Sequence, residues 1–145
     1  MLVLVVEDEP MIAASIEWEL LDAGYDVLGP ASSVAEAERL AAEHRPDLAL
    51  VDINLAGHDE GVALARDLKA RLGVPSVFVT GQLAQARQAS DAALGVLTKP
   101  FHFDALVETV PVAAALARGR RPARLPRGLE VFGDWTSDRT LAAAG

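Results

Sequence analysis

Four places in the sequence set a side chain that can do chemistry directly after a short apolar segment. Glu7 and Asp8 follow the first such segment, and Asp52, Thr80 and Lys99 each follow a later one. Carboxylates that share a small pocket repel one another, which raises the pKa of at least one of them unless a cation intervenes. Mg²⁺ binds hard oxygen ligands of this kind together with phosphate oxygens. A carboxylate can attack phosphorus, and an amine and a hydroxyl can bind phosphoryl oxygens, so these residue types predict phosphoryl transfer.

Each position by itself has a plainer explanation. An acid pair after a strand is often a solvated helix start, and Asp52 or Thr80 alone could serve a loop or a turn. The interpretation therefore depends on the coincidence of all four positions at strand ends. The sequence has no Gly-rich phosphate loop or dinucleotide fingerprint, and its three histidines show no metal-ligand spacing.

The segments between these residues alternate between strand and helix patterns. Apolar, β-branched runs predict strands, and apolar residues three or four apart predict helices. Ser33, with Glu36 three residues later, predicts a helix start, and Pro111 predicts a kink or an early stop in the last helix. The expected strands span residues 2–6, 26–29, 47–51, 76–79 and 96–98, and the expected helices span 10–23, 33–45, 61–72, 83–93 and a segment that begins near 103.

Five strands that alternate with five helices predict an α/β fold, with a parallel sheet covered by helices on both faces. In a doubly wound sheet of the order 2-1-3-4-5, the first and third strands flank the point where the strand order reverses, and ligands bind at the carboxyl ends there. That order would bring Glu7, Asp8 and Asp52 into one pocket, with Thr80 and Lys99 on the next two strands.

Four motifs resemble those of bacterial response-regulator receiver domains, over residues 1–117. They are Glu7-Asp8-Glu9-Pro10, Leu50-Val51-Asp52, Thr80-Gly81 and Leu97-Thr98-Lys99-Pro100-Phe101. The resemblance implies a flavodoxin-like, five-stranded fold and a two-component phosphorelay, in which a histidine kinase or a histidine phosphotransfer protein phosphorylates Asp52. It also implies a phosphoacceptor that assists its own phosphotransfer and dephosphorylation and signals by conformational change, and not an enzyme.

The resemblance further implies a role for each matching residue. Thr80 and Lys99 would bind phosphoryl oxygens, and a cis peptide bond before Pro100 would position Lys99. Four residues would form a magnesium site. Asp8 and Asp52 would bind the ion directly through their carboxylates, Glu7 would bind it through water, and Asn54 would bind it through its backbone carbonyl.

Two departures from the family pattern affect these expectations. The loop after Asp52 usually carries proline and glycine at the places that here hold Ala56 and Glu60, with Gly61 one residue further on, so we expect a reshaped loop. The position three residues before the lysine is usually Tyr or Phe and here is Val96. Another element must therefore read phosphorylation.

The C-terminal residues 118–145 differ in composition from the rest of the chain. The net charge is −8, but six arginines against three acids give this tail +3, which leaves −11 for the first 117 residues. An acidic body predicts no direct DNA binding. We expect the tail to be disordered or to form an interface, in which residues 129–132 could pair as a strand and Trp135 could dock. A homodimer could form through this tail or through the face of the fourth and fifth helices.

The composition also bounds the cellular setting. The chain has no cysteine, which excludes disulfides and thiol chemistry. Its apolar runs are too short for a membrane span, and no basic segment precedes the first of them, as a signal peptide would require. A cytoplasmic protein without membrane contacts is expected.

Three other interpretations remain. Residues 78–81, Phe-Val-Thr-Gly, resemble a receiver subgroup that includes many single-domain regulators, which favours a stand-alone regulator over one whose output domain is missing. A degenerate receiver could bind proteins independently of phosphorylation. A phosphohydrolase of the haloacid-dehalogenase type is disfavoured, because Asn54 stands where those enzymes need a second Asp as general acid-base.

Overall fold

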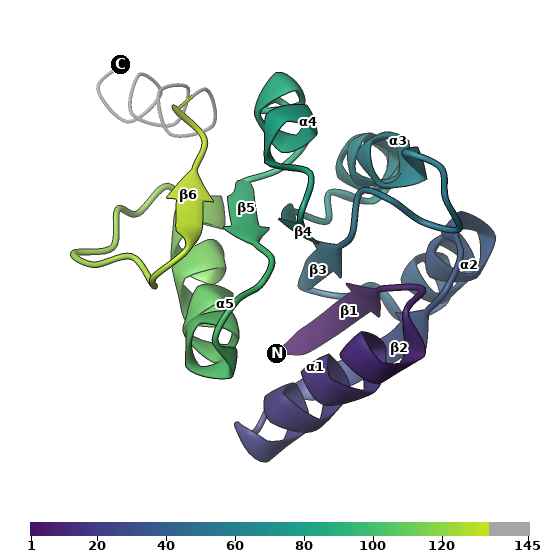
Figure 1. Ribbon diagram of the computed structural model, residues 1–145, viewed down its shortest axis with the longest axis horizontal. Helices are drawn as coiled ribbons and strands as arrows, with labels where there is room; N and C mark the ends of the chain where they lie inside the picture. The colour runs from purple at the N-terminus through teal and green to yellow at the C-terminus, as the bar shows by residue number, and fades with distance from the viewer. Residues whose placement is uncertain (134–145) are drawn as a thin grey trace.

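The structure, a computed structural model, describes residues 1–133 and contains a sheet of six strands in the order β2-β1-β3-β4-β5-β6 (Figure 1). The first five strands are parallel and only β6 runs antiparallel, against β5. The strands are β1 (Leu2–Val6), β2 (Asp26–Ala31), β3 (Leu48–Val51), β4 (Ser76–Thr80), β5 (Gly95–Thr98) and β6 (Leu129–Val131). The α/β class and the predicted order of the five parallel strands are confirmed, and the strand count is six rather than five.

Helices cover both faces of the sheet. One face carries α1 (Pro10–Asp22) and α5 (Phe103–Ala117), and the other carries α2 (Val34–His44), α3 (Glu60–Asp67) with its π-helical extension η1 (Leu68–Leu72), and α4 (Leu83–Gln88). Within residues 1–133, no helix is both long enough and apolar enough to span a membrane.

The side chains of β1 alternate between these two layers. Val3 and Val5 pack with α1 and α5, whereas Leu4 and Val6 pack with α2 and α3. Alternation with a period of two is the geometry of a strand, and apolar residues on both faces are what a sheet with two helical layers requires. This double burial fixes the position of the strand ends that carry the site.

Local signals set the helix starts as expected. The Ser33 hydroxyl accepts a hydrogen bond from the Glu36 amide at 3.2 Å, which caps α2. Pro10 occupies the first turn of α1, where its missing N–H leaves no bond unmade.

Two helix boundaries differ from the prediction. α4 ends at Gln88 instead of reaching residue 93, because the backbone leaves the helical region at Ala89 (φ −108°, ψ 36°) and the following residues turn into the core. Of the two outcomes predicted at Pro111, the early stop is wrong, since α5 continues to Ala117, and the kink stays a prediction. The side chain of Pro111 lies on the exposed side of α5.

The sixth strand lies in the segment expected to be a tail. The prediction that residues 129–132 could pair as a strand is confirmed, and the division at residue 117 marks the end of α5 but not the end of the sheet. Leu129 and Phe132 are buried against the domain itself, so the apolar surface that suggested a dimer is already covered. Dimerisation stays a prediction, and Trp135 lies outside the described residues.

Candidate functional site

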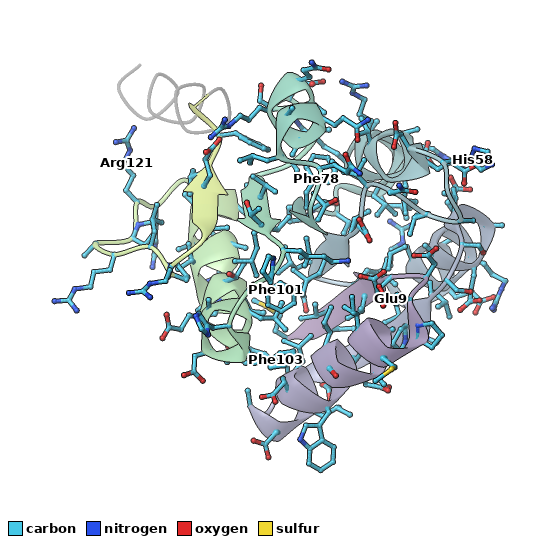
Figure 2. The ribbon with its side chains drawn as sticks, in the orientation of Figure 1. Glu9, His58, Phe78, Phe101, Phe103 and Arg121 are labelled. Atoms are coloured by element: carbon cyan, nitrogen blue, oxygen red, sulfur yellow. The ribbon has the colours of Figure 1, made fainter. Side chains whose placement is uncertain are left out.

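The carboxyl ends of four parallel strands meet at one edge of the sheet and carry the predicted site residues. Glu7 and Asp8 follow β1, Asp52 follows β3, Thr80 ends β4 and Lys99 follows β5. Figure 2 labels the neighbouring Glu9 and Phe101, between which this edge lies. The fold therefore brings the predicted residues to one place.

Three carboxylates form the centre of the site. One oxygen from each of Glu7, Asp8 and Asp52 lies within 4.8 Å of the others, and Glu7 and Asp52 are only 3% and 7% exposed. Burial raises the pKa of Glu7 above its ordinary value, the negative charge of Asp52 adds to the rise, and hydrogen bonds to the carboxylate partly offset it. Within residues 1–133 no other group of three metal-binding side chains lies this close, and no histidine belongs to it. An all-oxygen set of this kind could hold a hard divalent cation.

Lys99 bridges two of these carboxylates. Its amine donates to Asp52 Oδ2 at 2.9 Å and to Glu7 Oε1 at 2.5 Å. Burial by itself would lower the pKa of Lys99, but the two hydrogen bonds and the two negative charges outweigh it, so that the pKa is raised and the amine stays charged. The peptide bond between Lys99 and Pro100 is cis, as the resemblance implied.

Thr80 and Asn54 lie at the rim of the cluster. The Thr80 side chain is buried and its hydroxyl accepts a hydrogen bond from the Gln82 amide at 3.2 Å, so it is engaged with the start of α4. The backbone amide of Asn54 donates to Asp52 Oδ1 at 3.2 Å, which fixes the turn that follows β3. Both residues are at the predicted edge, and neither side chain bonds to the carboxylates.

Two residues that follow β3, Ala56 in the loop and Gly61 in the first turn of α3, were not assigned to the site from the sequence. The Ala56 amide donates to Asp8 Oδ2 at 2.8 Å, with Ala56 in the left-handed region at φ 53°. Gly61 packs directly under Asp52: a Cβ there would lie 2.1 Å from the Asp52 carbonyl oxygen. The one-residue displacement of this glycine was visible in the sequence, but its contact with Asp52 was not.

We expect Gly61→Ala to lower the free energy of unfolding by about 1–3 kcal/mol, because the added methyl group meets backbone atoms that cannot move aside. Chemical denaturation followed by circular dichroism measures this change. Gly133→Ala is the matched control, since a Cβ at Gly133 meets no atom within 4 Å. Equal stability of the two variants would show that the backbone at Asp52 tolerates displacement.

Comparison with known families agrees with this geometry. The family model described as "Response regulator receiver domain" matches residues 3–111. The chain belongs to this family. This match confirms the resemblance that the sequence motifs indicated.

Relatives of this receiver include regulators and receiver structures from several bacteria. The transcriptional regulatory protein PdtaR of Mycobacterium tuberculosis is 32% identical over 80% of this chain, and the phyllosphere-induced regulator PhyR of Methylorubrum extorquens is 39% identical over 54%. The match spans 58% of the length of PdtaR and 30% of PhyR. The receiver domain of a modulated diguanylate cyclase from Desulfovibrio desulfuricans G20 superimposes with a TM-score of 0.73 at 37% identity, over 81% of this chain and 95% of that one.

The receiver lacks an aromatic side chain at the position that the family usually fills with one. Val96 lies within β5 and is fully buried. It pairs with Glu130 of β6, on the side of β5 opposite to β4. Asp59 of the loop after β3 accepts a hydrogen bond from the Gln85 side chain of α4 at 2.7 Å. The strand at residues 129–132 was expected, but neither its pairing with Val96 nor the bond between Gln85 and Asp59 was predicted, because both contacts join segments far apart in the chain.

Proposed function

We propose that this receiver is a phosphoacceptor that takes a phosphoryl group onto Asp52 and signals by a change of conformation. The observation that carries the proposal is the hydrogen bond between the Lys99 amine and Asp52, inside a pocket formed with Glu7 and Asp8. A buried carboxylate beside a fixed ammonium is placed to receive an anionic group whose charge the ammonium offsets.

The transfer would proceed at one Asp52 carboxylate oxygen. That oxygen attacks the phosphorus of a phosphohistidine, a P–O bond forms, the P–N bond breaks, and the leaving imidazole takes a proton from solvent. Lys99 would exchange its bond to Asp52 for a bond to a phosphoryl oxygen. The hydroxyl of Thr80 would donate to another.

The donor set fits Mg²⁺, which prefers oxygen ligands and binds through one or two carboxylates together with phosphate oxygens. Asp8 and Asp52 would hold the ion directly, Glu7 through water, and Asn54 through its backbone carbonyl. The ion would neutralise negative charge that the carboxylates and the phosphoryl group bring together. In the chain itself, the Ala56 amide orients Asp8 and the Asn54 amide orients Asp52.

A histidine kinase or a histidine phosphotransfer protein is the proposed donor. An open pocket of about 420 Å³ adjoins the site, and Lys99 forms part of its wall together with mostly apolar side chains: Met11, Ile12, Ser15, Pro100, Phe101 and Phe103. Met11 is 82% exposed and Phe103 is 40% exposed, so a protein that delivers the phosphoryl group would find apolar surface beside the acceptor. In this proposal the receiver would act in the cytoplasm, on protein partners.

We propose phosphoacceptance over two of the other interpretations, the degenerate receiver and the phosphohydrolase. A degenerate receiver has no need for the complete set of pocket side chains, and a phosphohydrolase needs an acid where Asn54 stands. The charge distribution of the domain also supports protein partners over DNA, since residues 1–117 carry −11.

Removal of Mg²⁺ tests this function directly. We expect intact-mass analysis to find one added phosphoryl group after incubation with acetyl phosphate and Mg²⁺, and none when EDTA replaces Mg²⁺, because the carboxylates alone repel the donor. The label should be lost on treatment with hydroxylamine, which cleaves acyl phosphates. Labelling of equal extent in EDTA, or a label stable to hydroxylamine, would contradict the proposal.

A further inference from the structure

β6 lies beside β5 at the far edge of the sheet, between the two helical layers (Figure 1). The Thr98 amide donates to the Gly128 carbonyl at 3.2 Å, and the Phe132 amide donates to the Leu94 carbonyl at 3.0 Å, which extends the pairing beyond both ends of β6. Leu129 packs with the layer of α1 and α5, whereas Phe132 packs with the layer of α2, α3 and α4. β6 is therefore a fitted part of the domain.

β5 carries a glycine where β6 approaches most closely. A Cβ at Gly95 would lie 2.3 Å from the carbonyl oxygen of Glu130 and 3.2 Å from the Cα of Val131, both backbone atoms. Any larger residue at Gly95 would push β6 away from β5. Gly95 lies at the opposite end of β5 from Lys99, so this contact can be changed without touching the phosphoacceptor site.

α4 connects β6 to the loop beside the site. Arg87 donates two hydrogen bonds to the Glu130 carboxylate, at 2.8 and 2.9 Å, and lowers the pKa of that carboxyl. Two residues earlier, Gln85 donates to Asp59 in the loop that follows Asp52. α4 is therefore bonded to β6 through Arg87 and to the loop after Asp52 through Gln85.

α4 is also tied to Thr80, and it buries little apolar surface of its own. The backbone amide of Gln82, the residue directly before the helix, donates to the Thr80 hydroxyl at 3.2 Å. The helix has six residues, and Ala86 is its buried one. An element with so little buried apolar surface moves at low cost in free energy.

We propose that β6 reads the phosphorylation state of this receiver, in place of the missing aromatic side chain at Val96. The proposal rests on phosphorylation of Asp52 as proposed above. When the Thr80 hydroxyl turns to a phosphoryl oxygen, the Gln82 amide loses its acceptor, α4 shifts, and Arg87 separates from Glu130. β6 then leaves β5 and uncovers the edge of that strand.

Hydrogen exchange of the full chain measures this release. In the unmodified protein, amides of residues 129–132 should exchange slowly. After acetyl phosphate and Mg²⁺, with the phosphoryl group on Asp52 verified by mass in the same sample, we expect exchange about tenfold faster in that segment. The amides of β1 should not change.

Four variants, two tests and two matched controls, separate β6 release from general destabilisation. Gly95→Val should give fast exchange in residues 129–132 without phosphorylation, whereas Gly133→Val should not, because a Cβ at Gly133 meets no atom of residues 1–133 within 4 Å. Arg87→Gln should also speed exchange of this segment. Arg66→Gln breaks a comparable two-bond pair, with Asp91, and should leave β6 protected.

The possible outcomes distinguish this proposal from the function on which it rests. Phosphorylated protein whose residues 129–132 exchange within twofold of the unmodified rate would overturn the role of β6 and leave phosphoacceptance standing. Absence of any phosphoryl mass would overturn both. Fast exchange in Gly95→Val and Arg87→Gln, together with release on phosphorylation of the wild type, is the result that supports the proposal.

Discussion

Replacement of Asp52 by Asn is expected to abolish phosphoryl labelling altogether. Asn has the shape of Asp, so the packing of the turn against Gly61 can persist, but an amide lacks the nucleophilic carboxylate oxygen that attacks phosphorus. Intact-mass analysis after acetyl phosphate and Mg²⁺ measures the effect, and thermal unfolding verifies that the variant is folded.

A matched control for this substitution lies on the same strand segment. Asp47 directly precedes β3, at the end opposite to Asp52, and its carboxylate accepts a hydrogen bond from the Leu2 amide at 2.8 Å. Asp47→Asn makes the same chemical change away from the pocket and should label as the wild type does. Labelling of Asp52→Asn to the wild-type extent would transfer the acceptor role to Glu7 or Asp8 and refute the assignment.

The site was predictable because parallel strands align their carboxyl ends. Once the apolar runs before Glu7, Asp52, Thr80 and Lys99 are recognised as strands of one doubly wound sheet, the edge at which these residues meet follows from topology. The alternating burial of β1 and the capping of α2 by Ser33 follow from equally local rules. Short-range pattern was sufficient for these features.

The features that escaped prediction depend on contacts between distant segments. The fit of β6 requires a glycine at position 95, some 35 residues before its partner Glu130, and nothing in the neighbourhood of Gly95 indicates that contact. Gly61 lies beneath Asp52 although the family pattern places its glycine one residue earlier. α4 is shorter than its Ala-rich sequence suggests, since Ala92 and Ala93 are drawn into the core instead. Tertiary packing overrode local propensity at these places.

Replacement of Lys99 by Met is expected to slow labelling of Asp52 by about 10²–10³-fold, the usual cost of removing one group that stabilises developing negative charge. Met retains the length and apolar stem of Lys but carries no charge. The amine now bridges Asp52 and Glu7, so its loss also frees two carboxylates, and Mg²⁺ should bind at least as tightly as before.

This combination separates a role in transfer from a role in assembling the pocket. Mass analysis of samples quenched at successive times, at saturating Mg²⁺, gives the labelling rate, and calorimetric titration gives the Mg²⁺ affinity. Lys69→Met is the control, because the Lys69 amine bonds to the Asp91 carbonyl away from the site. If Lys99→Met weakened Mg²⁺ binding and labelled at a normal rate once saturated, Lys99 would serve the architecture of the pocket and not the transfer. A slow rate with retained Mg²⁺ affinity is the expected result, because Lys99 would offset charge on the transferred phosphoryl group and would not be a ligand of the ion.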